Sequence, residues 1–90
     1  MKPILTTKNF DKSYKKRIDR NKNLRTAYIK RISLFNNGER GYPLNDHVLS
    51  GKLSGKRSFS ISADVRIVYE ETADAILFLD IGTHNQVYRK

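Results

Sequence analysis

Residues 75–81 read Ala-Ile-Leu-Phe-Leu-Asp-Ile and are apolar at every position but one. Successive side chains of a strand point to opposite faces, so an apolar run without alternation is typical of a strand covered on both faces. We therefore expect residues 75–81 to form the central strand of the fold. The run is followed by Gly82, which we expect to permit a sharp exit that delivers His84 to the end of the sheet.

Two helices are predicted in the first half of the chain, after a short extended segment at residues 2–6. Thr7 is expected to cap the first helix, because its hydroxyl can accept an unpaired N–H of the first turn. Apolar residues of this helix recur at every fourth position, at Phe10, Tyr14 and Ile18. The second helix is expected to end near Gly38, and its apolar face consists of Leu24, Ala27, Tyr28, Ile32 and Phe35.

The second half of the chain has the patterns of strands. Residues 39–55 are expected to be a loop, whereas residues 58–62 alternate serine with apolar residues and residues 65–69 are mostly β-branched. Turns are expected at residues 63–64 and 70–74. The predicted fold is therefore α+β, with an N-terminal strand and a two-helix hairpin packed on one face of a mainly antiparallel sheet. The length of 90 residues predicts a single domain, 1–90.

The chain is strongly basic, with 18 Lys and Arg against nine Asp and Glu and a net charge of +9. Such a charge attracts polyanions, of which RNA or DNA is the usual one, although an acidic protein or an anionic membrane surface would fit it equally. There is no cysteine, and no segment approaches the roughly 20 apolar residues of a membrane span. We therefore expect a cytoplasmic protein that does not bind membranes.

Three stretches, taken with the order of elements, resemble the RelE/YafQ group of toxins from bacterial type II toxin–antitoxin systems. They are Asp46-His47 ahead of a Gly/Lys loop, GKRSFSISADVRIVYE at residues 55–70, and IGTHNQVY at residues 81–88. The resemblance covers essentially the whole chain. It implies a small endoribonuclease that cleaves mRNA, commonly on the ribosome, and that a cognate antitoxin silences.

The resemblance also implies a set of catalytic residues, namely His47, Asp64, Arg66, His84 and Tyr88. Tyr88 stands where the family keeps an aromatic residue, often Phe. Ser60 is a departure, because some YafQ-like toxins have a histidine at this place and a serine cannot supply a near-neutral acid–base group. The division of acid and base roles among the remaining residues therefore stays open.

The chemistry of a metal-independent ribonuclease agrees with these residue types. The ribose 2′-OH attacks the neighbouring phosphorus while a base takes its proton, an acid protonates the leaving 5′-oxygen and a cation stabilises the phosphoryl charge. The two histidines can serve near neutral pH, because imidazole has an ordinary pKa of about 6.5. The cations expected to contact RNA are Lys12, Lys15, Lys16, Lys52, Lys56 and Arg57. No metal-ligand spacing occurs, so no cofactor is expected.

Plainer interpretations stay open for every one of these residues. A loop histidine is usually a solvated polar residue, Asp64 suits a turn, and Arg66 can be the solvent-facing residue of a strand. A non-catalytic nucleic-acid-binding module accounts for the charge and the aromatic residues equally well, and an inactive family member accounts for Ser60. In the toxin interpretation, the antitoxin is expected to cover the basic surface with an acidic segment, as a helix in a groove.

Overall fold

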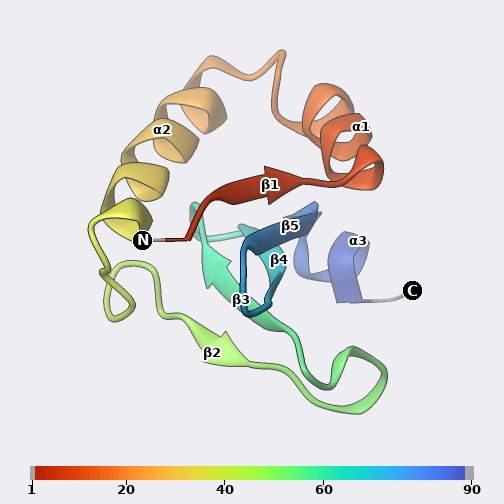
Figure 1. Ribbon diagram of the computed structural model, residues 1–90. Coiled ribbons are helices and arrows are strands. Elements are labelled where there is room, and N and C mark those ends of the chain that lie inside the picture. Colours follow the sequence, from red (N-terminus) through yellow and green to blue (C-terminus); the bar gives the residue numbers. More distant parts are fainter. Residues whose placement is uncertain (1, 89–90) are drawn as a thin grey trace.

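The computed structural model describes residues 2–88 and contains five strands and three α-helices in these residues (Figure 1). Their order is β1 (Ile4–Thr6), α1 (Lys8–Arg17), α2 (Lys22–Asn36), β2 (His47–Val48), β3 (Arg57–Ser60), β4 (Val65–Glu71), β5 (Ile76–Thr83) and α3 (His84–Tyr88). A short 3-10 helix, η1 (Gly51–Leu53), lies between β2 and β3. No helix within residues 2–88 is long and apolar enough to cross a membrane.

The strands form one sheet in the order β1-β5-β4-β3-β2. β1 pairs with β5 in parallel and every other pair is antiparallel, which confirms the predicted α+β class. The apolar run does form an interior strand, but its faces are unequally covered. Ile76 and Phe78 are buried, whereas Leu77 and Leu79 remain partly exposed. The expectation of a strand buried on both faces is therefore correct except at Leu77 and Leu79.

The caps of the two long helices follow from local sequence. The Thr7 side chain accepts the N–H of Phe10 at 3.1 Å, as predicted, and Asn21 accepts the N–H of Leu24 at 3.0 Å at the start of α2. Gly38 follows α2 with a φ of +87°, the left-handed conformation expected of a glycine at a helix end. Asn21, which stands between the two long helices, is thus the N-terminal cap of α2.

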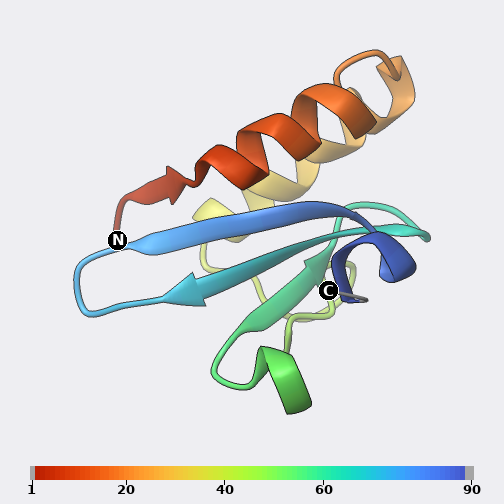
Figure 2. The ribbon, with the colours of Figure 1, turned by 90° about the vertical axis from the view of Figure 1, so that its right-hand side faces the viewer.

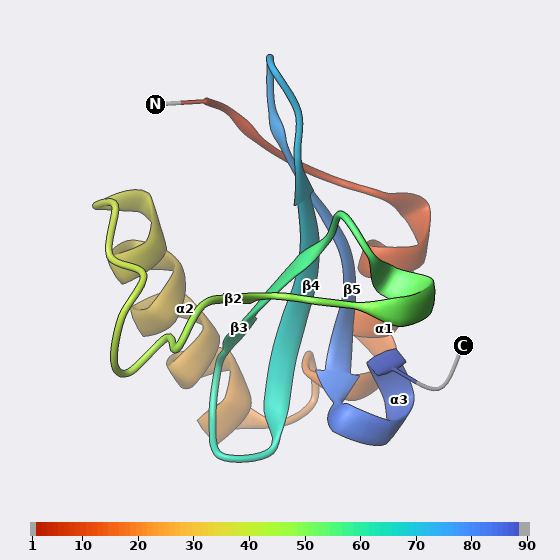
Figure 3. The same cartoon turned by 90° about the horizontal axis from the view of Figure 1, so that it is seen from below.

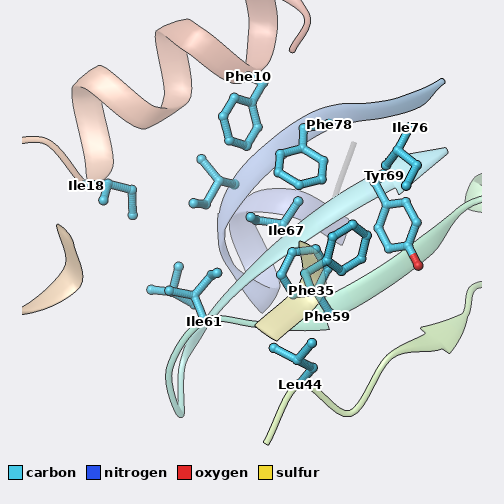
Figure 4. Packing of buried hydrophobic residues seen from close by; sticks show 12 residues of the cluster. Phe10, Ile18, Phe35, Leu44, Phe59, Ile61, Ile67, Tyr69, Ile76 and Phe78 are labelled. Atoms are coloured by element: carbon cyan, nitrogen blue, oxygen red, sulfur yellow. The ribbon is translucent and has the colours of Figure 1, made fainter. Parts of the chain in front are cut away.

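An aromatic cluster joins α2 to three strands of the sheet (Figure 4). Phe35 of α2 stacks on Phe59 of β3, with ring centroids 4.5 Å apart, and meets the rings of Tyr69 and Phe78 edge-on at 5.2 and 5.8 Å. All four rings are almost completely buried. The cluster lies on the face of the sheet that α1 and α2 cover (Figure 2).

The opposite face of the sheet carries smaller elements that the sequence patterns do not predict. α3 and η1 lie on this side, away from the two long helices (Figure 2). Val87 of α3 shares a small cavity of about 120 Å³ with Leu53 of η1 and Val68 of β4. The two predicted helices do cover one face, and α3 on the other face is an element that the sequence patterns did not predict.

Three boundary predictions are also corrected by the structure. Residues 39–55 are not wholly a loop, because they contain β2 and η1. β4 continues to Glu71, within the predicted turn 70–74, because Glu71 pairs with Ile76 of β5 and its carboxylate accepts a hydrogen bond from Lys2 at 2.8 Å. β5 does not end at residue 81 but continues to Thr83, which pairs with Val65 of β4.

The pH dependence of stability should report on Tyr69. Its burial, and then its hydrogen bond to Asp46, raise the pKa of Tyr69 above the ordinary 10.0. The resulting stabilisation is complete below pH 10 and is lost as pH rises toward the folded pKa, because the unfolded chain gives up its proton first. Above about pH 10, the free energy of unfolding should fall more steeply in the wild type than in Tyr69→Phe, by up to about 1.4 kcal/mol per pH unit. Urea denaturation at several pH values measures the difference, and parallel curves would contradict it.

Candidate active site

Both histidines of the chain line one hollow of about 450 Å³. His47 comes from β2, whereas His84 and Tyr88 come from α3, and Ser50 and Lys52 add to the polar part of the lining. Figure 3 shows β2, η1 and α3 in front of the same side of the sheet. The strand order thus brings together residues that are 37 positions apart (84 − 47) in the sequence.

A second hollow, of about 370 Å³, adjoins the first at His84. It is lined by Asp64, Arg66, Thr83, His84 and Asn85. His84 is exposed and belongs to both hollows, so the other four residues predicted to be catalytic line the two hollows that meet at it. Geometrically, the arrangement offers two imidazoles, one carboxylate and one guanidinium around an open site.

Tyr88 holds the C-terminal part of this site against the sheet. Its hydroxyl donates to Ser58 Oγ at 2.7 Å, and Ser58 is the residue that pairs with His47 between β2 and β3. The Tyr88 ring meets His84 edge-on with centroids 4.5 Å apart, because residues four positions apart share a helix face. Tyr88 therefore connects α3 to β3, the strand that pairs with β2. Sequence analysis gave no role to its partner, Ser58.

Arg66 has a donor that no described residue uses. Its Nε atom is buried and lacks a hydrogen-bond partner within residues 2–88. The guanidinium carbon lies 5.8 Å from the centroid of the Tyr88 ring. Arg66 also lines the second hollow, where its cationic guanidinium suits an anionic ligand.

A capping box begins α3 and was missed in the sequence. The N–H of Thr83 donates to Gln86 Oε1 at 2.8 Å, and the N–H of Gln86 donates to Thr83 Oγ1 at 3.3 Å. The spacing Thr-x-x-Gln is the local signal that could have predicted this helix. The cap fixes where α3 starts, and hence where His84 stands.

Gly82 leaves room for the ends of two neighbouring side chains and does not make a sharp turn. It lies inside β5 and is not among the glycines with positive φ. A Cβ atom at Gly82 would lie 2.6 Å from Gln86 Oε1 and 2.8 Å from Arg17 Nη1, which itself donates to the carbonyl of Ile81 at 2.9 Å. The expectation that Gly82 permits a sharp exit is therefore wrong.

The cations predicted to bind RNA do not all gather at this site. Lys12, Lys15 and Lys16 line a separate cleft of about 500 Å³ on α1, together with Asp19 and Arg20. Lys56 lines the small cavity beneath α3. Of the predicted RNA-binding residues, only Lys52 lines the hollow that contains both histidines.

Arg57 is held by an ion pair that the sequence did not indicate. Its Nε donates to Asp46 Oδ1 at 2.7 Å, and this hydrogen bond is the main cause that raises the pKa of Arg57. One of its donors is therefore committed within the protein. Among residues 2–88, no three His, Cys, Asp or Glu side chains are grouped so as to hold a metal ion.

The fold and this cluster of side chains define a small basic α+β protein with an open site suited to acid–base chemistry on an anion. A family model described as "Bacterial toxin of type II toxin-antitoxin system, YafQ" matches residues 2–89. The chain therefore belongs to the YafQ family of toxins from bacterial type II toxin–antitoxin systems. This confirms the resemblance to RelE/YafQ toxins.

Solved structures share the fold over nearly the whole chain. The crystal structure of YafQ from E. coli is 22% identical in sequence, covers 98% of this chain and 99% of its own, and has a TM-score of 0.80. YafQ in an E. coli DinJ–YafQ complex is 23% identical, with the same coverage and a TM-score of 0.78. A copper-bound mutant toxin from Helicobacter pylori is 26% identical, covers 98% of this chain and 100% of its own, and has a TM-score of 0.76. No curated protein sequence matches the chain.

The space around Gly82 generates a testable prediction. Gly82→Ala should displace Gln86 and remove the cap of α3, at a cost of about 1 kcal/mol in the free energy of unfolding. Gly41→Ala is the matched control, because a Cβ there meets nothing within 4 Å and the φ of Gly41 is not positive. Urea denaturation and hydrogen exchange of the Thr83 amide measure both effects. Equal stabilities and unchanged exchange at Thr83 would show that Gln86 does not cap α3.

Proposed function

We propose that this toxin is an endoribonuclease that cleaves mRNA on the ribosome, in the cytoplasm, by metal-independent acid–base catalysis. The observation that carries the proposal is the place of His84. It stands between a hollow containing His47 and a hollow containing Asp64 and Arg66. A phosphodiester seated at His84 would thus have acid–base groups on both sides and a guanidinium within the same site.

The reaction needs no group beyond those that surround His84. The ribose 2′-OH attacks the phosphorus, one of the titratable side chains accepts its proton, and another protonates the leaving 5′-oxygen. His84 and His47 share this work, with Asp64 as base or as the group that orients an imidazole. His47 and His84 are the two imidazoles of the chain, and Ser60 stands where some YafQ-like toxins have a further histidine.

Arg66 is the group that binds the scissile phosphate. Its side chain lines the second hollow, and a guanidinium can hold two phosphoryl oxygens as a planar fork. Charge that develops on those oxygens in the transition state would be stabilised by this fixed cation. Tyr88 offers an aromatic surface for a neighbouring base, as aromatic residues do in single-strand RNA sites.

Basic residues in the first hollow and on α1 extend the RNA-binding surface. Lys52 lies in the hollow itself, and the cleft on α1 presents the ammonium groups of Lys12, Lys15 and Lys16. Phosphate contacts of this kind position a nucleic acid without reading its sequence. Arg57 and Lys56 are less available, because one is paired with Asp46 and the other lines the cavity beneath α3.

A cognate antitoxin is the protein partner of the proposed toxin. The solved complex of E. coli YafQ with DinJ supports such a partner for a chain of the same family. A net charge of +9 favours an acidic antitoxin segment, which would cover the cations that RNA needs. Binding of antitoxin and of RNA would then exclude one another.

Replacement of His84 tests the proposed function. His84→Gln keeps a side chain of similar size with hydrogen-bonding capacity but cannot transfer a proton near neutral pH. Single-turnover cleavage of mRNA on programmed ribosomes should fall by about 10²–10⁴-fold, the usual contribution of a positioned general acid or base. The pH–rate profile should lose the limb that belongs to an imidazole.

Ribosome and RNA binding must be measured in parallel, because a weaker complex would mimic slow chemistry. The proposal expects binding within a few-fold of the wild type. Normal cleavage with an unaltered pH profile would remove His84 from the chemistry. No cleavage by the wild type itself would favour the non-catalytic alternative.

A further inference from the structure

The strand that carries His47, β2, makes few contacts that could fix its position. β2 consists of two residues at the edge of the sheet, and both side chains are exposed. It pairs only with β3, His47 with Ser58 and Val48 with Arg57. A strand this short does not fix its own position. The position of His47 must therefore be determined by its neighbours in the chain.

The preceding residue, Asp46, is half-buried as a whole, but its side chain is covered by the protein. Its side chain is 0% exposed. Arg57 Nε donates to one carboxylate oxygen at 2.7 Å, and the Tyr69 hydroxyl donates to the other. Both donors come from strands of the sheet, and Arg57 and Tyr69 face each other in the β3–β4 ladder. The carboxylate thus bridges two strands directly beside β2.

Tyr69 connects this carboxylate to the core. The residue is 1% exposed, and its ring packs edge-on against Phe35 and Phe59 at centroid distances of 5.2 and 5.8 Å. A hydroxyl on so rigidly packed a ring has a fixed position. Asp46 is consequently held by a residue of the buried aromatic core.

The backbone next to Asp46 also determines the state of the His47 ring. His47 Nδ1 lies 2.9 Å from the carbonyl oxygen of Asn45, which has a φ of +49°. A carbonyl oxygen can only accept, so Nδ1 carries the proton in this contact and Nε2 carries the lone pair of the neutral ring. Residues 45 and 47 flank Asp46, so the same anchor sets the carbonyl and the ring.

We propose that Asp46 is a positioning residue for His47. By pinning residues 45–47 to Arg57 and Tyr69, it keeps the Nδ1–H tautomer and directs Nε2 of His47 to the proton that it transfers. The proposal rests on the proposed function, in which His47 does acid–base work. Asp46 itself touches no substrate, since its carboxylate is buried and both of its oxygens accept hydrogen bonds from the protein.

The test compares Asp46→Asn with the wild type in two measurements. NMR of the ring nitrogens of His47 in the RNA-free protein should show one Nδ1–H tautomer in the wild type and a mixture in Asp46→Asn. Single-turnover cleavage on programmed ribosomes should fall by about 10–10²-fold, the effect of misplacing a catalytic group by about 1 Å, while binding stays within about three-fold. Asp74→Asn, which changes an exposed carboxylate in the β4–β5 turn, should alter neither.

Tyr69→Phe is the second variant, in case Asp46→Asn does not fold. It removes one of the two hydrogen bonds and leaves the Arg57–Asp46 pair intact. It should shift the His47 tautomer in the same direction by a smaller amount. An unchanged His47 spectrum in the folded variants would overturn the proposal, whatever happens to cleavage. A changed spectrum with a wild type that does not cleave would support the positioning role and reject the proposed function instead.

Discussion

Four aromatic rings, one from each of four elements, hold this fold together. Phe35 of α2 packs against Phe59 of β3, Tyr69 of β4 and Phe78 of β5, and each ring touches the others. Removing such a buried ring typically costs about 3–5 kcal/mol, a large part of the stability of a small domain. Tyr69 also carries the connection beyond the core, because its hydroxyl leaves the apolar cluster and binds Asp46. The aromatic cluster is thus linked to His47 by the hydrogen bond from Tyr69 to Asp46 and by the peptide bond that joins Asp46 to His47.

The C-terminal half of the site lies on α3, a helix too short to be stable by itself. α3 has five residues, far fewer than an isolated helix needs in water. Its start is fixed by the Thr83–Gln86 cap and its end by the hydrogen bond from Tyr88 to Ser58, while Val87 is buried between them. Both histidines therefore lie on short elements, β2 and α3, which the rest of the sheet holds in position. Such short elements leave the site open enough for a polymer such as RNA.

Sequence alone predicts those parts of the structure that arise from local pattern. The apolar faces of the two long helices, the Thr7 cap and the Gly38 stop are local, and the structure confirms them. β2 has two exposed residues and no pattern, so its strand character comes entirely from pairing with β3. Gly82 follows an apolar run and therefore looks like a turn signal in the sequence. Its actual neighbours are the side chains of Gln86 and Arg17, and the contact with Arg17 depends on the tertiary fold.

The candidate site shows the same division between local and distant causes. The family motifs indicate five residues, and the fold brings the other four into the two hollows that meet at His84. The ion pair between Arg57 and Asp46 joins residues 11 positions apart and depends on the β2–β3 register, which no local rule reveals. The sequence alone therefore predicts that Arg57 contacts RNA and predicts no role for Asp46.

The chemical identity of the cut ends tests the central claim most directly. Purified toxin would be incubated with mRNA-programmed ribosomes, and both termini of the fragments would be determined. If the side chains around His84 activate the ribose 2′-OH, the fragments must carry a 2′,3′-cyclic phosphate, or the 3′-phosphate formed from it, and a 5′-hydroxyl. Fragments with a 3′-hydroxyl and a 5′-phosphate would mean that water was the nucleophile, and would contradict the account of the site.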